Sequence, residues 1–406
     1  MSGLSQAAAG TWREETLAAA CPACGAEGLE LVYAQDGVPV HSCRLLDTRA
    51  EAVAFPRGSL RLGFCPACGV VTNTAYEASL QDYGVAYEET QGFSPRFRKF
   101  LRELAEELIE RHDVRGKELL EIGCGKGEFL VLMCELGGNR GVGIDPAFVP
   151  ERIETAADVT FVRDLYSEAY GHLAGDVVIC RHTLEHIHPV ADFMGLVRRS
   201  LAGRRDPLVF FELPDVGRVF RDVAFWDIYY EHCTYFSPGS LARLFRRTGF
   251  EVADLRLDYD DQYILLEARP AATPAPGEPL PLEETPEQLW EDIARFRARL
   301  EEERRRWHGL VRGVRAGGGR VAVWGSGSKG VSFLTTLALG EEVVVVVDVN
   351  PHKHGKFMPV TGHEIVPPEA LRDVGLDLVV AMNSIYLAEI GADLVRLGVE
   401  AKLVGA

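Results

Sequence analysis

Two glycine-rich turns, each between an apolar strand and a helix, most constrain how this chain can fold. The first lies in "LLEIGCGKGEFL" (119–130) and the second in "VAVWGSGSKGVSF" (321–333). After the first turn, strand-like segments such as "GDVVICR" and "PLVFFELP" alternate with helical ones. Such an alternation predicts a parallel sheet with helices on both faces. We therefore expect an α/β protein with one doubly wound sheet at each turn.

The length of 406 residues exceeds what a single core usually accommodates. "SPRFRKFLRELAEELIER" predicts a helix from Ser94 to Arg111, and the charged stretch from about Pro286 to Arg315 predicts another. Between the two sheets, "PAATPAPGEPLPLEETP" is Pro-rich and indicates a semi-extended linker. The expected parts are a metal-binding module (1–80), a first sheet domain (81–270), a linker with its helix (271–315) and a smaller second sheet domain (316–406).

The formal net charge of −17 argues against nucleic acid and anionic membranes as partners. The longest purely apolar run, Val343 to Val347, is far shorter than a membrane span. "MSGLSQAAAGTWREE" lacks the basic and then apolar pattern of a secretory signal. We expect a cytoplasmic protein with a small-molecule substrate. The oligomeric state is left open, and a monomer is compatible with the sequence.

The pentapeptide "CPACG" occurs twice, at 21–25 and at 65–69. Two thiolates three positions apart on a tight turn converge on one ion, and the glycine permits the left-handed backbone of that turn. In a cytosolic chain this spacing favours metal over disulfides, and four thiolates suit a structural Zn²⁺. The alternative is two unrelated surface turns. The predicted ligands are Cys21, Cys24, Cys65 and Cys68, whereas His41 and Cys43 are expected to pack or to face solvent.

The first glycine turn carries Glu121, Gly123, Gly125 and Gly127 where a strand passes into a helix. Glycines there let the backbone approach a ligand at the helix N-terminus. Asp145 ends the next strand, twenty residues after Gly125, where a carboxylate can hold ribose hydroxyls. The turn alone is also compatible with NAD.

The sequence pattern E-x-G-x-G-x-G resembles motif I of the class I S-adenosylmethionine methyltransferases. That resemblance implies that Glu121 orients the methionine end of the cofactor and that Asp164, in "FVRDLY", faces the adenine. "CRHTLEHIHPV" is similar to the loop that follows the fourth strand in that family. The cofactor-binding residues so implied are Glu121, Gly123, Cys124, Gly125, Gly127, Asp145, Pro146, Asp164 and Arg181.

The stretch "YYEHCTYFS" (229–237) sets Glu231 and His232 among aromatic residues. Ionisable groups between apolar walls are typical of sites that move protons. The structural alternative is an aromatic cluster around a satisfied buried histidine.

Over almost its whole length, the chain resembles the sugar C-methyltransferases that act on nucleotide-linked 4-keto deoxysugars. The resemblance rests on the double CPxCG module, the E-x-G-x-G-x-G domain, the "EH…YFS" segment and the second Rossmann-like domain. It implies His232 as the base that removes a proton α to the ketone. Glu231 would orient His232 or bind the sugar, and Tyr229 would donate to the keto oxygen or the pyranose. An imidazole suits this step, and the enolate oxygen that forms needs donors.

Further candidates lie near these segments. The resemblance suggests that His188 acts at the sugar, whereas His182 and His186 are interpreted as structural or cofactor-lining. Tyr83 and Tyr87 either close over cofactor and substrate or pack in the core.

The second glycine turn has the form G-x-G-x-x-G and is followed by Asp348 at a strand end, a dinucleotide fingerprint. The resemblance implies instead that this region binds the nucleotide-sugar, and a domain that only packs is a third possibility. Its "WGSGSKG" departs from the Ala-rich turn of the antibiotic-pathway members, so the nucleotide and sugar stay open. The residues expected to hold a diphosphate are Ser326, Ser328 and Lys329, with Lys353 or Lys356 nearby.

Together these features predict C-methylation of a nucleotide-linked keto-sugar with S-adenosylmethionine as methyl donor. Two alternatives remain. One is O- or N-methylation of a small metabolite, and the other is a non-catalytic protein that binds NAD or a nucleotide-sugar.

Overall fold

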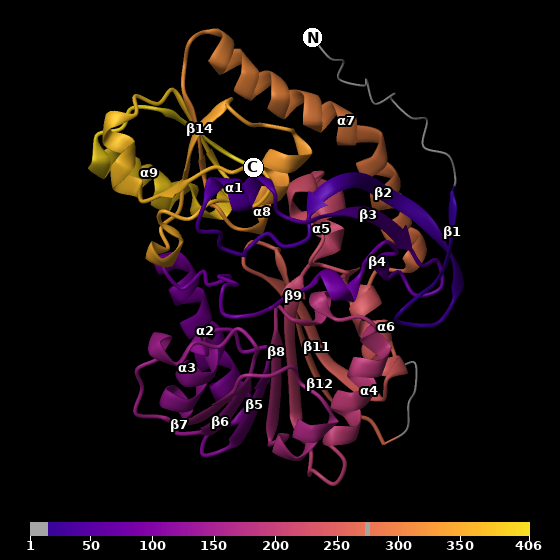
Figure 1. Ribbon diagram of the computed structural model, residues 1–406. Helices are drawn as coiled ribbons and strands as arrows, with labels where there is room; N and C mark the ends of the chain where they lie inside the picture. The colour runs from indigo at the N-terminus through magenta and orange to yellow at the C-terminus, as the bar shows by residue number, and fades with distance from the viewer. Residues whose placement is uncertain (1–14, 273–276) are drawn as a thin grey trace.

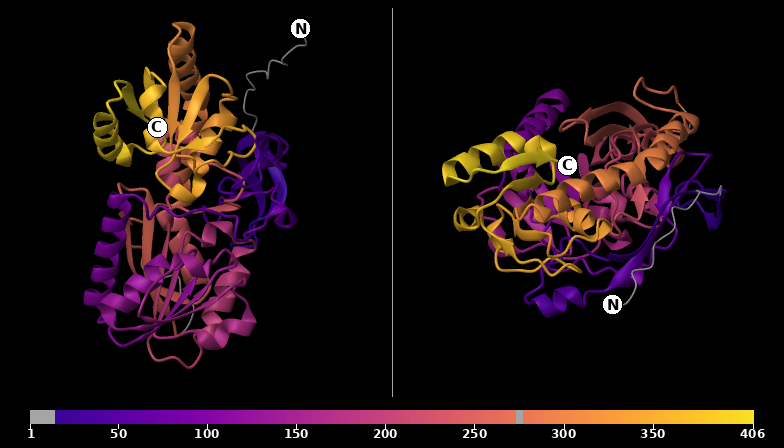
Figure 2. Two further views of the ribbon diagram at one scale, coloured as in Figure 1. Left: turned by 60° about the vertical axis from the view of Figure 1, so that its left-hand side comes forward. Right: turned by 90° about the horizontal axis from the view of Figure 1, so that it is seen from above.

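The computed structural model describes residues 15–272 and 277–406. Residues 1–14, which belong to the predicted metal module and to the segment without a secretory-signal pattern, lie outside this range. Linker residues 273–276 also lie outside it. Three sheets make up the fold (Figure 1). The second sheet occupies the lower half of Figure 1, the third sheet lies above it, and the first sheet flanks their junction, as Figure 2 also shows.

The first sheet is antiparallel, with the order β1-β2-β3-β4-β10. The two CPACG words form the turns between β1 and β2 and between β3 and β4. The sequence predicts these turns but not the four strands that carry them. The strands are β1 (Thr16–Ala20), β2 (Glu27–Pro39), β3 (Arg57–Phe64), β4 (Val71–Asn73) and β10 (Thr234–Tyr235), with helix α1 (Arg49–Val53) after β2.

Strand β10 comes from the aromatic stretch that carries His232. Thr234 pairs with Thr72 of β4. In addition, the carbonyl of Cys233 accepts hydrogen bonds from the Thr72 hydroxyl and from the Asn73 amide, each at 2.9 Å. The segment around His232 is therefore fixed to the sheet of the N-terminal module, a crossing that the sequence did not predict.

The second sheet has the order β11-β12-β9-β8-β5-β6-β7. Its strands β5 to β9 are parallel, and β12 runs antiparallel beside β9. This is the predicted class I methyltransferase fold, with β11 as an edge strand that the sequence analysis missed. The strands are β5 (Glu118–Ile122), β6 (Arg140–Ile144), β7 (Asp158–Val162), β8 (Val177–Arg181), β9 (Leu208–Pro214), β11 (Phe250–Asp258) and β12 (Tyr263–Pro270).

Helices cover both faces of this sheet because neighbouring strand residues alternate in direction. Leu119 and Ile179 pack with α2 and α3, whereas Leu120 and Val178 pack with α4 and α6. Ser94 caps α2, as predicted, since its hydroxyl accepts a hydrogen bond from the Phe97 amide. The helices are α2 (Pro95–His112), α3 (Glu128–Gly137), α4 (Val190–Ser200) and α6 (Pro238–Arg247).

The third sheet is parallel, with the order β15-β14-β13-β16-β17. The chain order reverses between β13 and β16, and such a switch point is where open α/β sheets bind ligands. The elements are β13 (Val321–Trp324), α8 (Ser328–Thr336), β14 (Val343–Val347), β15 (Ile365–Val366), β16 (Leu378–Ala381), α9 (Leu387–Leu397) and β17 (Lys402–Gly405).

Helix α7 (Pro286–Ala316), close to its predicted bounds, begins with a capping box at Thr285. It packs against α5 (Val216–Asp222) and also contacts β2 and β13. One apolar core therefore runs through all three parts, with members such as Tyr33, Phe64, Phe220, Phe296, Trp307 and Phe333. None of the helices in the described ranges combines the length and apolarity needed to cross a bilayer.

Candidate active site

A cavity of about 1210 Å³ lies between the carboxyl ends of the second and third sheets. All three parts of the chain line it, for example through Cys43, His232 and Lys329. Because the carboxyl ends of both parallel sheets face it, the cavity has the position at which such folds bind ligands.

The first glycine turn lies in the wall of this cavity. Gly123, Gly125 and Gly127 have φ values of +71°, +55° and +87°, which side-chain-bearing residues rarely adopt. A Cβ atom on Gly123 would lie 1.9 Å from Thr183 Oγ1. The Gly125 amide donates to Asp145 Oδ2 at 2.8 Å, so Asp145 is fixed beside the turn. The turn therefore exposes bare backbone to a ligand.

Glu121 supplies an unpaired acceptor at the same place. It is only 2% exposed, and its Oε2 has no hydrogen-bond partner in the part of the chain that the structure describes. Burial raises the pKa of its carboxyl to about 8, although Arg181 opposes this shift. A buried acceptor beside a bare turn fits the amino group at the methionine end of S-adenosylmethionine. The other predicted cofactor residues that line this cavity are Cys124, Asp145, Pro146, Asp164 and Arg181.

Asp164 lies at the exposed end of β7. Its Oδ1 accepts a hydrogen bond from the Leu165 amide at 2.8 Å, and the Tyr170 hydroxyl donates to Oδ2 at 2.6 Å. These contacts hold the pKa of its carboxyl below the ordinary value, with the Tyr170 hydrogen bond as the main cause. A negative charge is thus available near the position predicted for adenine.

A buried charged group supports the floor of the cavity. Arg181 binds Glu212 through two hydrogen bonds of 2.7 and 3.0 Å, and its guanidinium lies 4.3 Å from the Phe129 ring centre. His182 contacts the same carboxylate at 2.8 Å. Burial lowers the pKa of His182, but the nearby carboxylates of Glu185 and Glu212 outweigh this and raise it to about 9. His182 is therefore a cation at neutral pH.

His232 lines the cavity and is 5% exposed. Its ring centre lies 4.2 Å from that of Tyr229 and 4.8 Å from that of His186. Burial, assisted by the nearby His186, His182 and Lys329, lowers the pKa of His232 well below 6.5. His232 is therefore neutral at physiological pH, which is the state that a general base requires.

Glu231 points away from its neighbour in sequence. It is fully buried, and its Oε1 accepts a hydrogen bond from His41 Nδ1 at 2.9 Å. Because His41 Nε2 accepts a hydrogen bond from the Asp82 amide at 2.7 Å, Nδ1 carries the proton. Within the described ranges, no hydrogen bond joins Glu231 to His232. Glu231 thus contacts the N-terminal module and not the imidazole that it was predicted to orient.

Aromatic side chains form the wall near His232. The Tyr83 hydroxyl lies 3.0 Å from His186 Nδ1, and the Tyr83 ring packs edge-on against Tyr87 at 5.4 Å. Tyr229 and His188 line the same cavity. Burial lowers the pKa of His188. The predicted catalytic residues Tyr229, His188 and His232, with Tyr83 and Tyr87, are thus brought together.

Glu185 was not singled out by the sequence analysis. It is 2% exposed, and neither carboxylate oxygen has a hydrogen-bond partner among the described residues. Its Oε1 lies 3.8 Å from His182 Nδ1 and 4.0 Å from His232 Nε2. The H-x-x-E-H spacing at residues 182–186 was the available signal, because it places three ionisable groups on one loop.

The second glycine turn forms hydrogen bonds with its own sheet. The Ser326 amide and hydroxyl both donate to Asp348 Oδ2, at 3.0 and 2.6 Å, and Lys353 Nζ lies 3.4 Å from the same oxygen. The Ser328 hydroxyl lies 3.3 Å from the Cys43 thiol of the N-terminal module. Asp348, Ser326 and Lys353 are thus engaged with one another.

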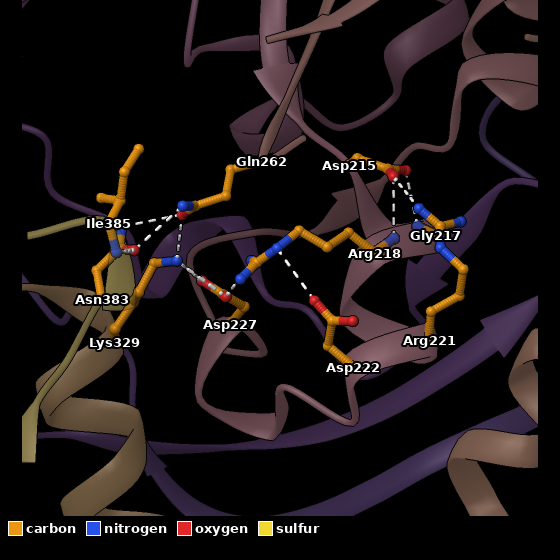
Figure 3. Close-up of polar contacts among 10 residues, drawn as sticks. All are labelled: Asp215, Gly217, Arg218, Arg221, Asp222, Asp227, Gln262, Lys329, Asn383 and Ile385. Atoms are coloured by element: carbon orange, nitrogen blue, oxygen red, sulfur yellow. Dashed lines mark hydrogen bonds and ion pairs between the residues drawn. The ribbon is translucent and has the colours of Figure 1, made fainter. Parts of the chain in front are cut away.

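Lys329 instead reaches across to the second sheet (Figure 3). Its Nζ lies 2.9 Å from Asp227 Oδ1 and donates to Gln262 Oε1 at 3.0 Å. Arg218 contacts the same Asp227 at 3.4 Å, and Gln262 and Asn383 exchange two hydrogen bonds. All five residues line the cavity. Sequence reasoning missed Arg218, Asp227, Gln262 and Asn383 because nothing in the sequence links these distant positions.

The four predicted metal ligands converge away from the cavity. The sulfur atoms of Cys21 and Cys68, and those of Cys24 and Cys65, lie 3.6 Å apart, and all four lie within 4.8 Å of one another. Zn–S bonds of about 2.3 Å place tetrahedral sulfurs about 3.8 Å apart. The cluster therefore has the dimensions of a closed metal site.

The sheet order, the bare glycine turn and the adjoining carboxylates define an S-adenosylmethionine-dependent methyltransferase. Residues 94–255 match the family described as methyltransferase domain, and residues 284–398 match the C-methyltransferase C-terminal domain. The chain is 31% identical to the C-methyltransferase NovU of Streptomyces niveus over 284 residues, which are 66% of this chain and 67% of NovU. The chain therefore belongs to the C-methyltransferase family.

Other similarities cover a smaller share of the chain. The chain is 28% identical over 176 residues to the ubiquinone biosynthesis O-methyltransferase of Neisseria meningitidis serogroup C, covering 37% of this chain and 71% of that one. Magnesium protoporphyrin IX methyltransferase from Synechocystis, solved with bound S-adenosylhomocysteine, covers 43% of this chain and 84% of its own, with a TM-score of 0.35 and 16% identity.

Proposed function

We propose that this enzyme transfers a methyl group from S-adenosylmethionine to a carbon α to the ketone of a nucleotide-linked 4-keto deoxysugar. The observation that carries the proposal is the neutral, buried imidazole of His232 in the cavity that the first glycine turn also lines. The family relationship to a C-methyltransferase supports carbon as the acceptor.

A carbon acceptor explains why a base is needed. A ketone must become an enolate before its α-carbon attacks a methyl group, so a positioned base must remove the α-proton. His232 takes that proton, a step that contributes about 10²–10⁴-fold in rate. Tyr229 and His188 line the same cavity and stabilise the enolate oxygen by donating hydrogen bonds.

The second sheet holds the methyl donor. S-adenosylmethionine supplies an electrophilic methyl group on its sulfonium. Glu121 and the bare turn at Gly123 bind its methionine end, while Asp145 and Asp164 bind its ribose and adenine. The products are the C-methylated ketone, S-adenosylhomocysteine and the proton on His232, which passes to solvent.

Side chains from α8 of the third sheet and from α5, which follows β9 of the second sheet, bind the nucleotide diphosphate. Lys329 and Arg218 are two cations that share the carboxylate of Asp227 at the cavity wall. A diphosphate competes with Asp227 for both cations through charge-assisted hydrogen bonds. Ser326 and Lys353 were also predicted to bind here, but their contacts with Asp348 favour Lys329 and Arg218 as the primary anion contacts.

We further propose that Cys21, Cys24, Cys65 and Cys68 hold a structural Zn²⁺. The spacing of their sulfur atoms supports this ion, because four thiolates leave no open coordination position for substrate. The ion would stabilise the sheet onto which the His232 segment is paired through β10.

The proposal is tested by incubating the enzyme with S-adenosylmethionine labelled with ¹³C in its methyl group and a panel of nucleoside diphosphate-linked 4-keto deoxysugars. A labelled methyl group bonded to a sugar carbon in the NMR spectrum supports C-methylation. A methoxy or N-methyl signal supports the O- or N-methyltransferase alternative instead. Sugar binding without methyl transfer to any acceptor supports the non-catalytic alternative.

A further inference from the structure

Glu185 is a buried acidic group for which the proposed mechanism has so far given no role. It lies on the loop after β8, in the cavity wall, and neither of its oxygens forms a hydrogen bond within residues 15–272 and 277–406. A buried carboxylate without hydrogen-bond partners is costly, so such a group calls for an explanation.

The position of Glu185 relates it directly to His232. Glu185 Oε1 lies 4.0 Å from His232 Nε2, within reach of a direct ion pair after a small side-chain rotation. The same oxygen lies 3.8 Å from the cationic His182. Glu185 therefore lies between His182, which is already charged, and His232, which becomes charged during the reaction.

Proton removal creates an electrostatic problem at His232. The imidazole is neutral at rest, and it becomes an imidazolium although its side chain is almost wholly buried. The other groups that face it do not supply negative charge: His186 from the same loop, Lys329 from α8, and Tyr229 and Tyr235 from its own segment. Glu231 is engaged by His41. Glu185 is the carboxylate placed to compensate.

We propose that Glu185 is a positioning residue for His232 and that its carboxylate pairs with the imidazolium formed when His232 takes the substrate α-proton. This inference rests on the proposed function. The C–H bond breaks, its electron pair forms the enolate, and the proton resides on His232 until solvent accepts it. Glu185 acts through His232 and exchanges no proton with the substrate.

The first experiment needs no substrate. The ring signals of His232 are titrated by NMR in the wild type and in Glu185→Gln, with His232→Gln used to assign them. An opposite charge within a few ångströms raises a histidine pKa by about one to three units. We therefore expect the pKa of His232 to fall by about one unit in Glu185→Gln. An unchanged titration overturns the pairing.

The second experiment measures exchange of the substrate α-hydrogen with deuterated water in the presence of S-adenosylhomocysteine. We expect Glu185→Gln to slow exchange at least tenfold at unchanged S-adenosylhomocysteine affinity, and Glu185→Asp to restore part of the rate. Glu110→Gln, an exposed change on α2, serves as the control and should behave as wild type. Wild-type exchange in Glu185→Gln overturns the inference, as does an equal loss of cofactor affinity, which would indicate a scaffold role.

Two further outcomes separate this inference from neighbouring ideas. Glu185, His186 and His232 also have the composition of a metal site. A metal site would make exchange stop when a chelator is added and resume when a divalent cation is returned. The wild type would then bind one equivalent of that cation, and Glu185→Gln would bind none. This result overturns the inference in favour of a metal site. Absence of exchange by the wild type with every keto-sugar overturns the proposed function, and the NMR titration then still decides whether Glu185 pairs with His232.

Discussion

His41 and Glu231 form a buried hydrogen bond of 2.9 Å although 190 residues separate them. One belongs to the N-terminal module and the other directly precedes His232. Together with the pairing of β4 and β10, this bond makes the N-terminal module a support for the segment that carries His232. The cluster of four cysteines, though remote from the cavity, is thereby connected to the site.

Removing His41 should destabilise the protein strongly. His41→Ala leaves the Glu231 carboxylate buried without its partner, and a buried group left unsatisfied costs about 1–3 kcal/mol, more when it is charged. Urea unfolding of His41→Ala, Glu231→Gln and the double variant measures this. We expect the double variant to lose less stability than the two single losses added together. Strict additivity would contradict a direct interaction.

Loss of one metal ligand should impair methyl transfer more than cofactor binding. Cys65→Ser is expected to abolish binding of one zinc ion per chain and to lower the rate of methyl transfer at least tenfold. The reason is that the sheet that holds β10 loses the stabilisation that the metal provides. Binding of S-adenosylhomocysteine, which depends on the second sheet, should stay within threefold. Cys134→Ala, on α3 and outside the cluster, is the control and should retain the metal. Full activity of a zinc-free Cys65→Ser protein would refute the link.

The glycine turn should not tolerate a methyl group at position 123. In Gly123→Ala, the new Cβ would lie 1.9 Å from Thr183 Oγ1, so the backbone that faces the cofactor must shift. Calorimetry should record at least a tenfold loss of S-adenosylhomocysteine affinity. Gly138→Ala is a matched control, because Gly138 has a similar φ of +62° but has no atom within 4 Å of its added Cβ. Equal losses of affinity in both variants would show that backbone strain at a positive φ, and not the close contact with Thr183, causes the effect.

Lys329 should contribute to binding of the nucleotide diphosphate. A hydrogen bond to a charged group is worth about 1.5–3 kcal/mol, so Lys329→Met is expected to weaken nucleoside diphosphate binding by about 10- to 100-fold. Lys356→Met removes the same charge outside the cavity lining, from a lysine that pairs with Asp47. It should leave affinity within twofold. If both variants bind equally well, the diphosphate lies elsewhere.

Sequence reasoning succeeded where the signal is local. The CPACG words form matching turns, and the glycines at 123, 125 and 127 have the left-handed backbone that only glycine adopts readily. Asp145, predicted from its place at a strand end, also reaches the cavity, because the carboxyl ends of parallel strands share an edge.

Contacts between distant segments could not be predicted in the same way. Glu231 and His232 are adjacent in sequence, yet their side chains diverge because β10 joins the first sheet and directs one toward His41 and the other toward the cavity. The contacts of Lys329 with Asp227 and Gln262 depend on how the third sheet packs on the second. No local pattern encodes such packing.

The low pKa of His232 should also appear in the stability of the protein. Unfolded histidine takes up a proton below about pH 6.5, whereas folded His232 stays neutral to lower pH, so acidification favours the unfolded state. On acidification from pH 7.5 to pH 5.5, the neutral His232 should lower the free energy of unfolding by about 1 kcal/mol. The unfolding free energy of His232→Gln should therefore fall by about 1 kcal/mol less than that of the wild type over the same pH range. His182, whose pKa is raised, has the opposite effect on stability, and this effect cancels because both proteins contain it. An identical pH dependence would contradict a neutral buried imidazole.

The most direct test of the central claim is the rate at which His232→Gln exchanges the α-hydrogen of a keto-sugar substrate with deuterated water, relative to wild type, with S-adenosylhomocysteine bound. Since His232 is the proposed base for this proton, exchange should be rapid in the wild type and at least 10²-fold slower in the variant. Cofactor affinity should be equal in both. Exchange by His232→Gln at the wild-type rate would contradict the account.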